Sequence, residues 1–199
     1  MTQTESPSKK KILDAAIKHM LAKGYGATTV DEICKTAGLT KGSFFHYFET
    51  KEDLGKAALK YFYGMMKEMM EKDGFLTQPD PLDRIYGYID FTINLFKGDF
   101  SERSCLIGNI AQELSNTHEE IRKLCAGLLL EQSNMFKQFL DEAKIKYAPA
   151  GNIDTQNLSD SLLSLIQGSL VFTKAIRDDK LLERNLTHYK VCLERLFGG

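Results

Sequence analysis

The stretch of sequence that decides the fold is TTVDEICKTAGLTKGSFFHYFETKEDL, residues 28–54. Within it, Thr29 lies three residues before Glu32, the capping-box spacing that opens a helix. Gly38 ends that helix, since glycine adopts the left-handed conformation of a helix end without strain. Thr40 can then cap a second helix. Two short helices joined by a tight turn form a helix-turn-helix, whose second helix can enter the DNA major groove.

The second of these helices has a buried and an exposed side. Phe44 and Phe48 lie four residues apart, so both can face the first helix and hold the second one in place. Gly42 has no side chain and lets the backbone approach a phosphate or a base closely. Lys41 and Lys51 add positive charge on either side of this helix. The other side chains left on its surface are those of Thr40, Ser43, Phe45 and Tyr47.

The run LTKGSFFHYFETKEDL, residues 39–54, together with the upstream helix ending in Gly-Tyr, resembles the DNA-binding head of the TetR family of bacterial transcriptional repressors. By motif the resemblance covers residues 9–60. It implies nine helices: a three-helix head, a linking helix, and a helical-bundle body that binds ligand and dimerises. Members commonly repress transcription until a small molecule in the body moves the two heads apart. The DNA contacts that the resemblance implies are Thr29, Thr40, Lys41, Gly42, Ser43, Phe45, His46, Tyr47 and Lys51.

The composition favours an all-α fold. Leu occurs 25 times and Ile 13 times, but Val only 3 times, whereas a sheet protein of this size uses far more β-branched Val. Apolar residues recur at helical spacing in residues 9–23 and in the linking helix, whose predicted buried stripe is Leu54, Ala58, Tyr61, Phe62, Met65 and Met69. Five further helical segments are predicted over residues 82–96, 103–114, 118–147, 155–177 and 182–197.

The segment DGFLTQPDP, residues 73–81, combines helix breakers and turn formers, which predicts the main boundary of the chain. We therefore divide the sequence into a DNA-binding head over residues 1–50, with its helix-turn-helix at about 29–48. A linking helix follows over residues 51–72. Residues 73–199 form the domain that we expect to bind ligand and to dimerise.

The charge distribution indicates an anionic partner at one end of the chain only. The formal net charge is −1, but residues 1–60 carry +3 and residues 61–199 carry −4. The four cysteines are scattered without a C-x-x-C pair, which fits a reducing cytoplasm. No stretch approaches the roughly 20 apolar residues that span a bilayer. We expect a cytoplasmic protein that binds double-stranded operator DNA and no membrane.

Catalytic and metal-binding motifs are missing from the sequence. The four histidines have no partner at metal-ligand spacing, and there is no Ser-His-Asp pattern, phosphate-binding glycine loop or H-E-x-x-H motif. We therefore expect no enzyme activity, no cofactor and no metal. The alternative class is a helical ligand carrier that does not bind DNA.

The second domain is predicted to hold an apolar cavity within residues 82–176, suited to a small hydrophobic or amphipathic effector. Its candidate lining is Ile89, Phe96, Cys105, Ile110, Phe136, Phe139 and Phe172. The strongly apolar segment 155–177 and the striped segment 182–197 are expected to pair with their copies in a homodimer. The candidate interface residues are Leu162, Ile166, Gly168, Ser169, Leu170, Leu186, Tyr189 and Leu193.

Cys105 has a second interpretation. It opens a short helix near Arg103, and both a helix start and a nearby cation favour the reactive thiolate. Its segment RSCLIGNIAQELSNTHEEIR, residues 103–122, resembles a branch of the family that responds to electrophiles or unsaturated small acids. Cys105 is thus either an electrophile sensor or a buried structural cysteine.

Overall fold

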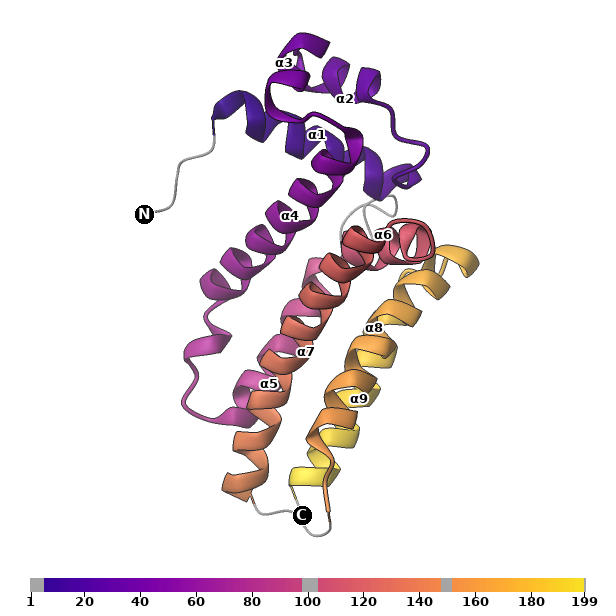
Figure 1. Ribbon diagram of the computed structural model, residues 1–199. Helices are drawn as coiled ribbons and strands as arrows, with labels where there is room; N and C mark the ends of the chain where they lie inside the picture. Colours follow the sequence, from indigo (N-terminus) through magenta and orange to yellow (C-terminus); the bar gives the residue numbers. More distant parts are fainter. Residues whose placement is uncertain (1–5, 98–103, 148–151, 199) are drawn as a thin grey trace. The chain divides into compact units, whose positions relative to one another are not determined.

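The computed structural model describes residues 6–97, 104–147 and 152–198, and within these ranges it consists of helices and contains no strand (Figure 1). The all-α prediction is confirmed. No helix in the described ranges is long and apolar enough to span a membrane. The helices are α1 (Pro7–Lys23), α2 (Val30–Ala37), α3 (Lys41–Tyr47), α4 (Lys51–Asp73), the 3-10 helix η1 (Phe75–Thr77), α5 (Pro81–Leu95), α6 (Leu106–Leu114), α7 (Glu119–Tyr147), α8 (Thr155–Ile176) and α9 (Leu181–Phe197).

The chain forms two compact units that are not contiguous in sequence. The first contains Met1–Met66 and Cys105–Gly127, and the second contains Lys67–Ser104 and Leu128–Gly199. Helices α4 and α7 therefore contribute residues to both units. Helix α6 belongs to the first unit, with α1, α2 and α3. The division at residues 50 and 73 concerns function and stays a prediction.

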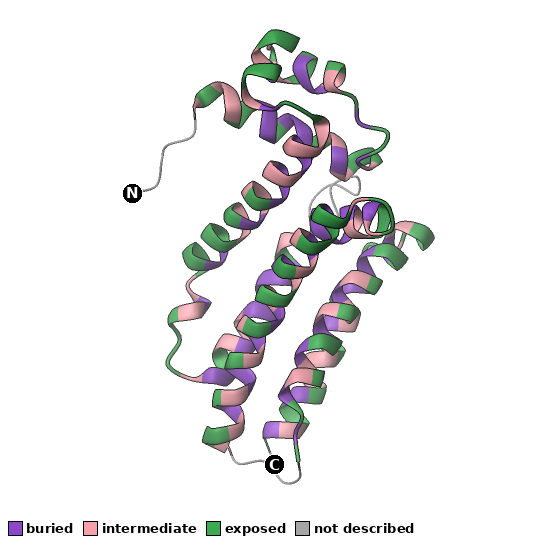
Figure 2. Ribbon diagram, viewed as in Figure 1, coloured by how far each residue is buried: buried purple, intermediate pink, exposed green. Residues whose placement is uncertain are grey.

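The first unit is built around the buried face of α1, which packs on α2, α3 and α6. Ser6 caps this helix and Pro7 occupies its first turn, where the missing N–H of proline costs nothing. Ile12, Leu13 and Met20 are fully buried on one face, and Figure 2 shows the alternation of buried and exposed positions along the helix. These contacts give the first unit a core of its own.

The second unit is a bundle of α5, α8, α9 and the larger part of α7. Tyr88 of α5 is 1% exposed, its ring packs 5.2 Å from that of Phe136 on α7, and its hydroxyl accepts a hydrogen bond from Gln132 at 2.7 Å. A buried Ser133–Ser159 hydrogen bond of 3.0 Å joins α7 to α8. The core of this unit is thus aromatic and aliphatic, with a small number of paired polar groups.

The predicted stripe of the linking helix is correct at its start and wrong at its end. Leu54 and Ala58 are fully buried, but Met69 is 43% exposed and the neighbouring Met70 is 5% exposed. Met70 lies nearly on the opposite side of the helix from Leu54, because successive residues are separated by about 100° around the axis. The start of α4 belongs to the first unit and its end to the second, so the two ends bury different sides of the helix.

Candidate nucleic-acid interface

The helix-turn-helix forms as its caps predict. The Thr29 hydroxyl accepts from the Glu32 N–H, while the Glu32 side chain accepts from the Thr29 N–H, which completes the capping box of α2. Gly38 ends α2 in the left-handed conformation, with φ of 65°. Thr40 caps α3 by accepting from the Ser43 N–H at 3.2 Å. The turn between the two helices is therefore fixed by short-range hydrogen bonds.

Two phenylalanines fix the orientation of α3 within the first unit. Phe44 is fully buried and Phe48 is 4% exposed, with their ring centres 5.7 Å apart. The next residue after Phe44, Phe45, is 56% exposed. A fully buried and a half-exposed phenylalanine side by side define which face of α3 points into the protein and which points outward.

The outward face of α3 carries most of the predicted DNA contacts. Thr29, Thr40, Lys41, Gly42 and His46 are exposed, and Ser43 and Tyr47 are partly so. A Cβ added at Gly42 would meet only the Thr40 hydroxyl, at 3.6 Å, so the backbone there is open to an approaching ligand. The Tyr47 hydroxyl accepts a 2.8 Å hydrogen bond from Ser6, which ties the end of α3 to the start of α1.

Charged side chains on this face are already paired in the free protein. The Lys41 ammonium lies 2.7 Å from the Asp31 carboxylate, and both side chains are more than half exposed. The hydrogen bond to Asp31 raises the pKa of Lys41, which stays fully protonated. Lys23 and Thr29 together lower the pKa of Glu32 to about 2, since they stabilise its ionised form.

Lys51 is engaged in contacts within the protein. Its ammonium donates to the Gly26 carbonyl oxygen at 3.2 Å and lies 4.3 Å from the centre of the Tyr25 ring. Burial lowers its pKa. The structure therefore directs this side chain toward the turn between α1 and α2.

The same turn is held by a residue that the sequence interpretation missed. Glu113 of α6 accepts from the Tyr25 N–H at 2.8 Å and from the Gly26 N–H at 2.5 Å. The sequence Gly-Tyr-Gly predicts a turn whose backbone N–H groups require hydrogen-bond acceptors. Nothing in the sequence indicates that the acceptor is a side chain 87 residues away.

The predicted cavity residues are divided between the two units. Ile89, Phe136 and Phe139 are buried in the second unit, and Cys105 and Ile110 are buried in the first. Phe96 is partly exposed just after α5. Phe172 is 55% exposed on α8 and lines no interior space in the described structure.

Cys105 occupies the N-cap position of α6, as the sequence predicts, and is buried. Its expected neighbour Arg103 lies outside the described residues. Cys125 of α7 is also buried, and its burial raises the pKa of its thiol to about 11. Cys192, on α9, is exposed.

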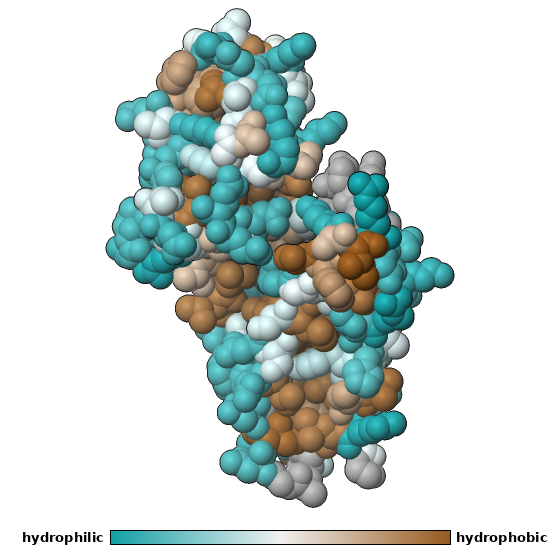
Figure 3. Space-filling model, turned by 90° about the vertical axis from the view of Figure 1, so that its right-hand side faces the viewer, coloured by the Kyte–Doolittle hydropathy of each residue, from teal (hydrophilic) through white to brown (hydrophobic). Residues whose placement is uncertain are grey.

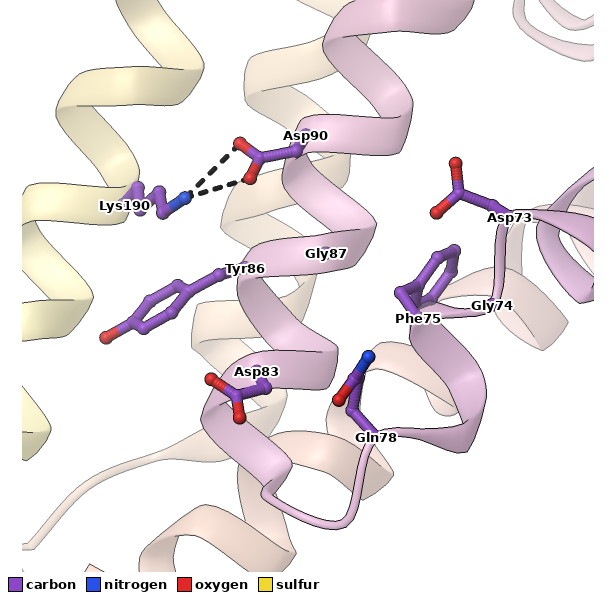
Figure 4. A pocket seen from close by; sticks show the side chains of 9 residues that line it. All are labelled: Asp73, Gly74, Phe75, Gln78, Asp83, Tyr86, Gly87, Asp90 and Lys190. Carbon is purple, nitrogen blue, oxygen red and sulfur yellow. Dashed lines mark hydrogen bonds and ion pairs between the residues drawn. The ribbon is translucent and has the colours of Figure 1, made fainter.

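A pocket of about 560 Å³ opens in the second unit among η1, α5 and α9 (Figure 4). Lys190 crosses from α9 to donate to Asp90 of α5 at 3.0 Å, and its ammonium lies 5.1 Å from the Tyr86 ring centre. The pocket is also lined by Asp73 and Asp83, so carboxylates form part of its wall. None of the predicted cavity residues lines it.

Most of the predicted dimer residues are used within one chain. Leu162, Ile166, Leu170, Leu186 and Leu193 are 3% exposed or less, because they pack α8 against α9. Ser169 accepts from Asn185 at 2.9 Å, and Tyr189 donates to the Leu158 carbonyl at 2.7 Å. Gly168 is exposed, and a Cβ added there would point into open space.

From residue 161 onward, the exposed residues of α8 are small or apolar. Val171, Phe172 and Ile176 are each about half exposed. Figure 3, which looks onto the side of α8 and α9, shows apolar surface interrupted by polar side chains. The small or apolar exposed residues of this helix, here called the α8 outer stripe, are Ser161, Ser164, Gly168, Val171, Phe172, Ala175 and Ile176.

Comparisons with known proteins agree with this architecture. Residues 12–58 match the tetR family of bacterial regulatory proteins, and residues 81–189 match the tetracyclin repressor-like C-terminal domain. The chain is 27% identical to the transcriptional regulator AcuR of Cereibacter sphaeroides, covering 86% of this chain and 79% of that one. It is 25% identical to the HTH-type transcriptional repressor NemR of Escherichia coli, covering 94% of each. A regulatory protein TetR from Rhodobacter sphaeroides has the same fold, with a TM-score of 0.83 at 24% identity over 93% of this chain and 98% of that one.

Proposed function

Because this chain belongs to the TetR family of bacterial regulatory proteins, we propose that it is a repressor that binds an inverted-repeat operator as a homodimer and releases it when a small molecule binds. The observation that carries the proposal is the outward face of α3. Phe45 is 56% exposed beside the bare backbone of Gly42, on the helix that a helix-turn-helix places in the major groove. A protein that acts on an operator works in the cytoplasm, where bacterial DNA lies.

The residues of the outward face take two roles in this proposal. Thr29 and Thr40 stand at helix starts, where hydroxyl and backbone N–H groups suit phosphate oxygens. The side chains of α3 enter the major groove and contact base edges. The proposed DNA contacts are Thr29, Thr40, Lys41, Gly42, Ser43, Phe45, His46 and Tyr47. Lys51 contacts the turn before α2, so we assign it no phosphate.

The α8 outer stripe is the proposed dimer interface. Small residues let two helices approach closely, and Val171, Phe172 and Ile176 supply the apolar area that a stable dimer buries. Two heads related by a twofold axis would bind half-sites about one DNA turn, roughly 10 bp, or a multiple of it apart.

Footprinting of the purified protein on genomic DNA tests the function directly. We expect protection of an inverted repeat, with an affinity that falls steeply as salt rises, because phosphate contacts release counterions. A ligand carrier without DNA binding would give no footprint and no dependence on salt.

The effector is proposed to bind in the second unit and to be a small hydrophobic or amphipathic compound. The aromatic core around Tyr88 and Phe136, with Gln132 as a polar group, supports this class. The effector must bind the DNA-free conformation more tightly, since equal affinity for both conformations shifts nothing. Release of labelled operator from the complex by candidate compounds measures this difference.

Electrophile sensing through Cys105 is the second candidate. Its position at the N-cap of α6 is the observation that supports it. A soft electrophile should then release the operator from the wild type and leave the Cys105→Ser complex intact. Equal release from both proteins would make Cys105 a structural residue.

A further inference from the structure

The turn between α1 and α2 is bound by one carboxylate through two successive backbone N–H groups. Glu113 Oε2 accepts from Tyr25 at 2.8 Å and Oε1 accepts from Gly26 at 2.5 Å. A carboxylate that accepts two N–H bonds forms charge-assisted hydrogen bonds, which are shorter and stronger than those between neutral groups. Glu113 lies on α6, outside the three helices of the proposed DNA-binding head.

Two glycines leave space for the Glu113 carboxylate and for the Tyr25 ring. A Cβ at Gly26 would lie 2.7 Å from Glu113 Oε1, so only glycine allows the carboxylate to come this close. A Cβ at Gly55 of α4 would lie 2.9 Å from the Tyr25 ring. Glycines therefore stand where the carboxylate and the Tyr25 ring make their closest approaches.

The turn leads directly into the capping box of α2. The Thr28 N–H donates to the Tyr25 carbonyl at 3.1 Å, and the Thr28 hydroxyl donates to the Gly24 carbonyl at 2.7 Å. Thr29, the next residue, caps α2. The orientation of the turn consequently sets where α2 begins, and α3 packs on α2.

We propose that Glu113 is a positioning residue for operator binding: it contacts no DNA, but it holds the Gly24–Gly26 turn so that α2 and α3 present their outward face correctly. The proposal rests on the proposed DNA-binding function. It makes α6 a direct determinant of the geometry of the DNA-reading helices.

Charge alone predicts the opposite effect of removing Glu113. DNA is an anion, so deleting a negative charge from this unit should tighten binding to every sequence. Loss of the positioning role should instead weaken operator binding. The sign of the change in affinity therefore distinguishes the two roles.

The first experiment measures the affinities of Glu113→Gln and Glu113→Ala for operator and for random DNA over a range of salt. We expect operator affinity to fall about tenfold, with the salt slope unchanged because no phosphate contact is lost. Glu120→Gln is the matched control, since it removes one charge from the same unit at a side chain paired with Lys123, and should not weaken operator binding. Unchanged or tighter operator binding by both Glu113 variants would overturn the proposal.

A double-mutant cycle with Gly26→Ala provides the specific test. The new methyl group displaces the carboxylate, so Gly26→Ala alone should weaken operator binding about as much as Glu113→Ala. In the Glu113→Ala background it should have no further effect, because the group it displaces is gone. Additive losses would show that the two residues act separately and would overturn the proposal.

Amide hydrogen exchange at Tyr25 and Gly26 tests the positioning contact without DNA. Both amides should exchange faster in Glu113→Ala than in the wild type, while the amides of α1 keep their protection. Unchanged exchange at the turn would overturn the proposal even if operator binding by Glu113→Ala were weakened. Failure of the wild type to bind any operator would instead refute the proposed function and leave this result standing.

Discussion

Lys51 donates a hydrogen bond to the carbonyl oxygen of Gly26 at 3.2 Å. The carbonyl of this turn residue is thus bound from α4, while its N–H is bound by Glu113 of α6. The Lys51 ammonium also faces the Tyr25 ring, a contact that strengthens when the cation is partly desolvated. Helices α4 and α6 thus both bind Gly26, in the turn that precedes the helices of the proposed DNA interface.

Replacement of Lys51 by Ala should therefore weaken operator binding through the turn. We expect operator affinity to fall about threefold to tenfold. The slope of log affinity against log salt should not change, because the ammonium binds the Gly26 carbonyl oxygen and not a phosphate. Lys41→Ala is the comparison: it removes a cation from the face that is proposed to meet the DNA, so the slope should fall. A slope reduced by about one in Lys51→Ala would show instead that Lys51 binds phosphate, as the sequence alone predicts.

The Lys41–Asp31 ion pair restrains a proposed DNA contact. Both side chains are exposed and 2.7 Å apart, so the pair is weak, and DNA must compete with it. Asp31→Asn should raise the affinity for operator and random DNA alike by about twofold to fivefold at low salt. Fluorescence anisotropy with labelled duplexes measures the change.

The matched control for Asp31 is Asp14→Asn. Asp14 is an exposed acid on α1 that pairs with Lys10 at 2.9 Å, so its replacement changes the net charge equally but frees no lysine of α3. An equal gain in Asp14→Asn would mean that the effect is one of total charge.

Local signals explain why the helix-turn-helix could be predicted from the sequence. The Thr29 capping box, the left-handed Gly38 and the Thr40 cap each depend on residues within four positions of one another. Their geometry follows from backbone preferences that tertiary packing does not override here. The exposure of Phe45 beside the buried Phe44 follows from the same helical spacing.

The remaining features depend on contacts between distant residues. Glu113 reaches Gly26 across 87 positions, and no short-range pattern encodes that pairing. Helix α8 is apolar around much of its circumference, so periodicity could not separate Leu170, which is buried, from Val171, which is half exposed. The predicted interface was drawn largely from the most hydrophobic positions, and those positions already pack inside the chain.

The α8 outer stripe should determine the oligomeric state. Val171 is 50% exposed, and a glutamate there would bury an unpaired charge in the proposed interface. We expect Val171→Glu to sediment as a monomer at micromolar concentration, with operator affinity reduced about a hundredfold or more because one head binds only a half-site.

Ile145→Glu is the control for this change. Ile145 is an 82% exposed apolar residue on α7, outside the stripe, so the same substitution should leave the dimer and the operator affinity intact. A dimeric Val171→Glu would place the interface elsewhere on the chain.

Acid should remove the stabilising contribution of Glu32. This residue closes the capping box of α2 and accepts from Lys23 at 2.6 Å, which lowers its folded-state pKa from 4.5 to about 2. Since the folded pKa lies below the unfolded one, ionised Glu32 stabilises the fold above about pH 4.5, and this contribution disappears as the pH falls through about 2. Glu32→Gln should thus lower the Tm at about pH 6, and the difference from the wild type should shrink steadily as the pH approaches 2.

Glu68→Gln, at an exposed acid whose Lys72 partner is 3.8 Å away, should show little difference at either pH. A Tm difference for Glu32→Gln that stays constant with pH would show that its charge does not stabilise α2.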